Sequence, residues 1–131
     1  MTKQWKEATK RGDLERIRAL LQNGADINAK DEHGQTALMH AAHTGKAELV
    51  RLLVEQGADL NVTAKYNLSA LMLAVIGGHV EIAQRLIEAG ADVTIRGSGS
   101  FNGKSALMLA EAGGHEEMVR LLKGLDSLSF R

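Results

Sequence analysis

The sequence predicts an all-α solenoid, in which helix-turn-helix units stack in a row and β-hairpin-like turns join them. One marker is a glycine that recurs at intervals of 33, 33 and 36 residues, as Gly12, Gly45, Gly78 and Gly114. A second marker is the tripeptide Gly-Ala-Asp, which occupies residues 24–26, 57–59 and 90–92. Independent markers that share one period of roughly 20 to 50 residues indicate a repeat array. The period gives about four units, with three extra residues inserted before the last.

The array predicts one domain over residues 1–131, a length that suits a single domain and not two. We expect an N-terminal capping repeat over 1–30, full repeats over 31–63 and 64–96, and a C-terminal capping repeat with an inserted turn and a tail over 97–131.

Polar substitutions mark the two terminal units. Lys6 and Glu7 stand at apolar positions of the first helix expected in the opening unit. At the other end, Glu111 and Lys123 replace apolar residues of the inner units. Terminal repeats need a polar outer face for solubility, so these substitutions favour a complete, capped array.

Each unit after the first has the signals of two short helices. Thr36, Ser69 and Ser105 each precede an Ala-Leu-Met stretch, where a hydroxyl can accept hydrogen bonds from the free N–H groups of a helix start. The repeated glycines end these first helices, because glycine readily adopts the left-handed conformation that stops a helix. Second helices with apolar residues at helical spacing are predicted over 47–56, 80–89 and 116–123.

Two further details concern the connections. Asn67 stands at the turn position of Gly34 and Gly103, which we expect to require a positive φ, and Asn is the non-glycine residue that tolerates it best. The tail over 124–131 carries Leu125, Leu128 and Phe130, and two readings stay open for it: the tail folds over the last helix pair, or it is a frayed end.

The recurring residues of the four units resemble the ankyrin repeat. The family pattern T-P-L-H-x-A-A is similar to T-A-L-M-H-A-A at 36–42 and to S-A-L-M-L-A at 69–74 and 105–110. The closing G-A-D-V-N of the family is similar to G-A-D-I-N, G-A-D-L-N and G-A-D-V-T, which begin at residues 24, 57 and 90. In all three units the family's proline is Ala and its motif histidine is Met. We therefore do not expect the side-chain hydrogen-bond network that the family builds on that histidine, whereas the resemblance still implies the family's packing.

The resemblance implies a protein–protein interaction module that presents turn tips and a concave face to another protein. In the ankyrin family, certain variable repeat positions face the partner. The candidate binding residues are those at these positions here: Tyr66, Phe101, Ile76, Leu68, Lys65, Asn102, Lys104, His33, Gln35 and His43. Apolar residues appear at such positions only in the third and fourth units, and exposed aromatics with charged neighbours are typical of binding hot spots. An alternative is that Tyr66 and Phe101 lie against each other or fill the enlarged last turn.

Composition narrows the function classes. Sixteen Lys and Arg balance sixteen Asp and Glu, which argues against a nucleic-acid or anionic-membrane protein, since both rely on an excess of basic charge. Cysteine is absent, which removes disulfides and Cys-based zinc sites. The start of the chain is polar and no apolar run is long enough for a membrane span, so we expect a cytoplasmic protein. We also expect the helix stack to be monomeric.

Three constellations could carry chemistry, and none predicts an enzyme, a cofactor or a metal. G-S-G-S-F-N-G-K-S at 97–105 resembles a phosphate-binding loop, but Ser98 stands where that loop needs its first glycine. His40 and His43 are three residues apart on one helix, a spacing at which both could bind one metal ion. The sequence does not place a third ligand beside them. A contact between His40 and Glu7 is a further hypothesis. The remaining alternatives to a binding module are a regulatory or inhibitory subunit of a separately encoded enzyme and a small-molecule or nucleotide site at 97–105.

Overall fold

The computed structural model describes the backbone of residues 1–129 and the side chains of residues 1–124. That part of the chain forms eight α-helices, two short 3₁₀ turns and no β-strand, which confirms the predicted all-α architecture. The helices are α1 (Lys3–Arg11), α2 (Leu14–Gln22), α3 (Ala37–Thr44), α4 (Ala47–Glu55), α5 (Ala70–Ile76), α6 (Val80–Glu88), α7 (Ala106–Ala112) and α8 (Glu116–Ser129). The 3₁₀ turns are η1 (Lys65–Asn67) and η2 (Gly99–Phe101).

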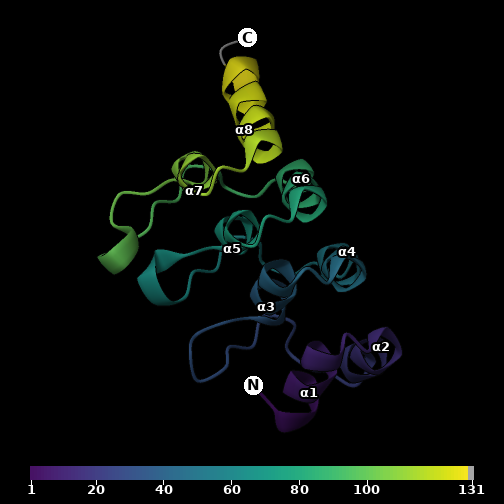
Figure 1. Ribbon diagram of the computed structural model, residues 1–131. Coiled ribbons are helices and arrows are strands. Elements are labelled where there is room, and N and C mark those ends of the chain that lie inside the picture. Colours follow the sequence, from purple (N-terminus) through teal and green to yellow (C-terminus); the bar gives the residue numbers. More distant parts are fainter. Residues whose placement is uncertain (130–131) are drawn as a thin grey trace.

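The helices stand in two rows, and each unit adds one helix to each row (Figure 1). α1, α3, α5 and α7 form the row beside the turns, while α2, α4, α6 and α8 form the other row. Leu53 and Leu86 of the second row are fully buried between neighbouring units, and Ala41 and Ala74 of the first row are equally inaccessible. Because these alanines have small side chains, the helices of the first row approach one another closely and the stack becomes continuous.

The predicted helix starts are confirmed at atomic level. The hydroxyls of Thr36, Ser69 and Ser105 each accept a hydrogen bond from the backbone N–H three residues later, at 3.2–3.3 Å. Each bond satisfies one of the N–H groups that a helix leaves free at its start. α3 then ends at Gly45, whose φ of 81° closes the helix as the sequence indicates.

The last helix differs from the prediction. The sequence predicts that it ends at residue 123, but α8 continues to Ser129, so residues 124–129 prolong the helix and do not fold back over the last pair. Phe130, the third apolar residue of the tail, lies outside the described residues.

The turns between units are closed by backbone hydrogen bonds as in a β-hairpin, but their arms do not form β-strands in the described residues. One backbone hydrogen bond of 2.9–3.1 Å joins residues 31 and 35, 64 and 68, or 97 and 104 across each turn. A row of asparagines ties successive units together beneath these turns. Asn28 Oδ1 accepts a hydrogen bond from the backbone N–H of Asp59, and Asn61 Oδ1 accepts one from that of Asp92, both at 2.8 Å. The Gly-Ala-Asp-x-Asn segments therefore fix the spacing between neighbouring units.

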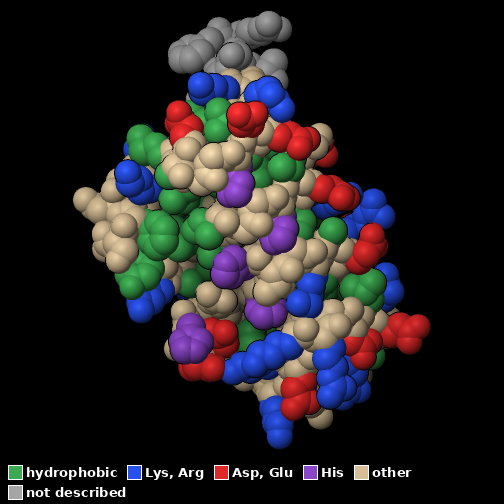
Figure 2. Space-filling model, in the orientation of Figure 1, with side chains coloured by type: hydrophobic (Ala, Val, Ile, Leu, Met, Phe, Trp, Pro, Cys, Tyr) green, Lys and Arg blue, Asp and Glu red, His purple; other side chains and the backbone are tan. Residues whose placement is uncertain are grey.

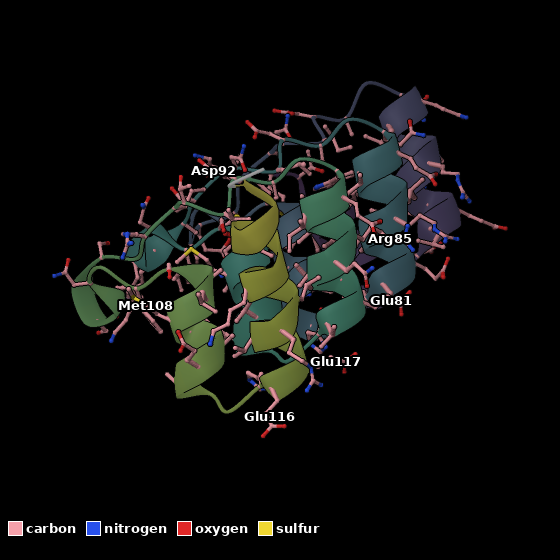
Figure 3. All side chains as sticks on the ribbon, turned by 90° about the horizontal axis from the view of Figure 1, so that it is seen from above. Glu81, Arg85, Asp92, Met108, Glu116 and Glu117 are labelled. Atoms are coloured by element: carbon pink, nitrogen blue, oxygen red, sulfur yellow. The ribbon has the colours of Figure 1, made fainter. Side chains whose placement is uncertain are left out.

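Among the described residues, the fourth unit is packed on one side and open on the other. α5 buries six consecutive residues, 70–75, because units lie on both of its sides, whereas α7 buries only Ala106 and Ala110. Met72 and Met108 occupy the same position in their units, yet Met72 is 1 % exposed and Met108 is 40 % exposed. Figure 3 looks onto this end of the stack, where Met108 borders an open cleft of about 340 Å³.

Candidate protein-interaction surface

Two aromatic side chains from different units meet at the tips of the turns. Tyr66 comes from η1 and Phe101 from η2, and their ring centroids lie 5.6 Å apart with the planes tilted by 52°. The backbone N–H of Ser98 also donates a 2.7 Å hydrogen bond to the carbonyl of Tyr66, which joins the two turns directly. Figure 1 shows both turns projecting from the same side of the stack. The two rings therefore form one shared apolar surface.

The backbone around Tyr66 is shaped to present its ring. Asn67 has a φ of 56°, which confirms the positive φ expected there, and Tyr66 itself has a φ of 64°, which the sequence does not indicate. Asn67 Nδ2 donates to the carbonyl of Arg96 at 3.0 Å and so anchors the strained turn to the next unit. Gly99 supplies space, since a Cβ at residue 99 would lie 2.7 Å from Cδ1 of Tyr66.

One cationic side chain lies over a ring, and two more belong to the segment around η2. Lys65 Nζ lies 4.9 Å from the centroid of the Tyr66 ring, in cation–π geometry. Hydrogen bonding by Lys65, followed by Ser100, lowers the pKa of the Tyr66 phenol. Arg96 donates from Nη1 to the carbonyl of Gly103 at 2.8 Å, while Lys104 is exposed. We call Lys65, Tyr66, Arg96, Phe101 and Lys104 the tip patch.

The sequence predicts that the aromatic pair is either an exposed binding hot spot or packed ring against ring, and its geometry contains part of each. Tyr66 and Phe101 do lie against each other, and both remain only half-buried, so the contact between them leaves ring surface open to solvent. Figure 2 shows hydrophobic side chains gathered on this side of the molecule, with Lys and Arg side chains at both ends of the group.

The assignment of Leu68 to the partner-facing set is wrong. Only 7 % of its surface is exposed, and it belongs to the hydrophobic core. Leu68 lies on the returning arm of the turn, next to the buried cap Ser69, so its side chain packs under the turn against the helices. Ile76 at the end of α5 is half-buried and packs against the same core, which leaves part of it accessible.

The other predicted residues are spread along the turn side. Asn102 is exposed in the last turn, beside the tip patch. His33 and His43 are exposed and Gln35 is half-buried in the second unit, where the surface is polar. Next to them, Lys6 Nζ donates a 2.6 Å hydrogen bond to Glu32, which lowers the pKa of that carboxyl to about 2. The structure therefore concentrates the apolar part of the candidate surface in the third and fourth units.

The histidines form a column on the face shown in Figure 2. His79 lies between two units, because its Nε2 is 3.0 Å from the carbonyl oxygen of His43 and its ring fills the space above Gly45. A Cβ at residue 45 would lie 2.7 Å from the His79 ring. Within the described residues, no group of three His, Cys, Asp or Glu side chains is placed to hold a metal ion.

The contact predicted between His40 and Glu7 is wrong. Burial lowers the pKa of His40, with further contributions from Lys46, Lys10 and His43, and Glu7 is not among its charged neighbours. Glu7 is exposed and borders a cleft toward α2 instead, because it lies on the outward side of α1.

The segment over 97–105 is a closed turn. Six of its backbone N–H groups, those of residues 97, 98 and 101–104, donate to carbonyls of the turn or of Tyr66. A phosphate-binding loop needs such N–H groups free to surround the anion. The Ser105 hydroxyl, in turn, is occupied in capping α7. The local geometry therefore matches a structural turn.

A stack of helix pairs with a row of projecting turns is a repeat-type scaffold. Comparison with known families agrees: a family described as ankyrin repeats in three copies matches residues 6–97, and one described as an ankyrin repeat matches residues 102–126. The chain belongs to the ankyrin repeat family. A search of curated proteins found no match. Ankyrin repeats are generally protein–protein interaction modules and typically non-enzymatic. Across the described residues, every helix is too short or too polar to cross a bilayer.

Proposed function

We propose that this protein binds a partner protein on its concave face and turn tips, with the tip patch as the centre of the contact. The observation that carries the proposal is the partly exposed Tyr66–Phe101 pair. Aromatic side chains that stay partly open lose much solvent contact when a partner covers them, and such residues dominate the energy of many interfaces. The paired turns hold both rings before binding, so little conformational entropy is lost.

Neighbouring residues extend the contact from this centre. Ile76 and Asn102 adjoin it, and the polar His33, Gln35 and His43 of the second unit provide the rim. A polar rim that excludes water around an apolar centre is the usual anatomy of a protein interface. The proposal includes a monomeric, cytoplasmic protein, for which size-exclusion chromatography with light scattering tests the oligomeric state and cell fractionation the location.

The test begins with an affinity pull-down and mass spectrometry, which identify partners and show whether one of them is an enzyme that this chain regulates. Binding is then compared for the wild type and the double variant Tyr66→Ala/Phe101→Ala. Alanine keeps a Cβ at residue 66, so the cost of the positive φ remains similar and the rings alone are removed. Gln84→Ala, an exposed position on α6, is the control.

The expected result is a loss of partner affinity of about tenfold or more in the double variant, with a melting temperature close to the wild type. Unchanged affinity together with a strongly lowered melting temperature would mean that the rings only hold the two turns together, and the proposed contact would be refuted.

A further inference from the structure

The turns that carry the tip patch contain charged residues of a single sign. Residues 60–80 and 93–110 contain no Asp or Glu. These two stretches include the turns of the third and fourth units, all of α5, and α7 as far as Ala110, one residue before Glu111; their charged side chains are Lys65, Arg96 and Lys104. All three side chains belong to the tip patch. The two turns that carry the rings therefore hold positive charge only, and Glu111 lies in the cleft that Arg96 also lines.

Four carboxylates of these units lie in the second row of helices, while Asp92 and Glu111 lie outside it. Glu81 and Glu88 are exposed on α6, and Glu116 and Glu117 are exposed on α8. Figure 3 shows Glu81 far from the turns, on the side of α6 that faces away from them, and Figure 2 shows Asp and Glu side chains gathered along that edge. The second helices also carry Arg85, Arg120 and Lys123, so charge of both signs is mixed there, whereas the two turns carry positive charge alone.

The second unit does not share this bias. Its turn carries Asp31 and Glu32, and Lys6 is paired with Glu32 at 2.6 Å. The positive field is accordingly confined to the tip patch. A localised field of one sign attracts a segment of opposite sign and disfavours segments of like sign.

Resting on the proposed function, we infer that the tip patch binds an acidic segment of a partner protein that carries an aromatic or branched apolar side chain. The apolar side chain covers the Tyr66–Phe101 rings, and flanking Asp or Glu residues face Lys65, Arg96 and Lys104. Lys65 already lies over the Tyr66 ring, so a carboxylate at this point would approach the ammonium at the edge of the apolar contact. The rings supply affinity, whereas the cations favour a partner segment of negative charge and accelerate its association.

A library of random short peptides displayed on phage tests the inference, because the selection does not require the partner to be identified first. Peptides are selected on the wild-type protein, and those that Tyr66→Ala/Phe101→Ala no longer binds are sequenced. The affinity of these peptides is then measured for Lys65→Glu/Lys104→Glu. The matched control is Arg51→Glu/Arg120→Glu, which changes the net charge equally at exposed positions of the second helices. Circular dichroism melts confirm that both variants fold.

We expect the selected peptides to be enriched in Asp and Glu around an apolar residue. Lys65→Glu/Lys104→Glu should weaken their binding about tenfold or more at low ionic strength, and the loss should shrink in about 0.5 M salt, where the Debye length falls to a few ångströms. The control variant should bind like the wild type.

Four results would overturn the inference, and they differ in what they leave of the proposed function. Ring-dependent peptides of neutral or basic sequence, or equal losses in the two charge variants, would refute the acidic partner while the binding surface stands. Failure to select any ring-dependent peptide would refute the surface itself. If single-stranded DNA bound at the tip patch and displaced the peptides, a nucleic acid would replace the acidic protein as the ligand.

Discussion

The two methionines at equivalent positions of α5 and α7 allow a direct test of how much each unit gains from its neighbours. Met72→Ala removes Cγ, Sδ and Cε from a side chain that is 1 % exposed, and truncation of a fully buried Met costs about 2–5 kcal/mol once the cavity is included. Met108 is 40 % exposed and borders an open cleft, so Met108→Ala leaves no enclosed cavity and should cost only about 1 kcal/mol of unfolding free energy.

Urea unfolding followed by far-ultraviolet circular dichroism measures both losses under the same conditions. Each variant serves as the control of the other, because the residue type, the helix position and the helix sequence around it match. The denaturant slope must stay unchanged for the free energies to be compared. Equal losses, within about 0.5 kcal/mol, would mean that α7 is covered as completely as α5 and would refute the packing described for the fourth unit.

Three further predictions follow from single residues. Leu53→Ala, at a fully buried position in α4, should lower the free energy of unfolding by about 2–5 kcal/mol, and a loss under about 0.5 kcal/mol would show that the repeat register is wrong. Asn67→Gly should be close to neutral in a thermal melt, because relief of the positive φ offsets the lost hydrogen bond to Arg96, whereas Asn67→Val should destabilise; equal melting temperatures would contradict the role of φ. His40 has a pKa lowered by burial, so the folded state binds fewer protons than the unfolded state and stability falls as the pH drops below about 6.5. His40→Leu should remove this part of the pH dependence in unfolding titrations between about pH 7.5 and 5, and an identical pH profile would show that His40 does not contribute.

The fold was readable from the sequence because it repeats local signals. The hydroxyl caps, the ending glycines and the helical spacing of apolar residues each act over a few neighbouring positions, and each recurs at a fixed period. The positive φ of Asn67 followed in the same way, from comparison with Gly34 and Gly103 at the same turn position.

The candidate site was only partly readable, because its details depend on contacts between units. Nothing in the sequence gives the direction in which the returning arm of the turn points Leu68. The left-handed backbone of Tyr66 depends on the inserted turn, where Gly99 leaves space for the ring. The neighbours of His40 depend on how α1 rotates against α3, which places Glu7 on the outward side. The hydrogen bonds from Asn28 and Asn61 to the next unit could have been found from the sequence, since both asparagines recur at the repeat period.

The unequal packing of the two sides of α7 has a consequence for the order in which the protein comes apart. In a linear array each unit is held mainly by its nearest neighbours, so a terminal unit with an open face detaches at a lower free energy than an inner one. Within the described residues the fourth unit packs against the third, and α7 buries two residues where α5 buries six. Backbone amides of α7 should therefore exchange with solvent deuterium through partial opening, well before those of α3 and α5. Because η2 belongs to the fourth unit, such an opening would also separate Phe101 from Tyr66 and dismantle the tip patch while most of the stack remains folded.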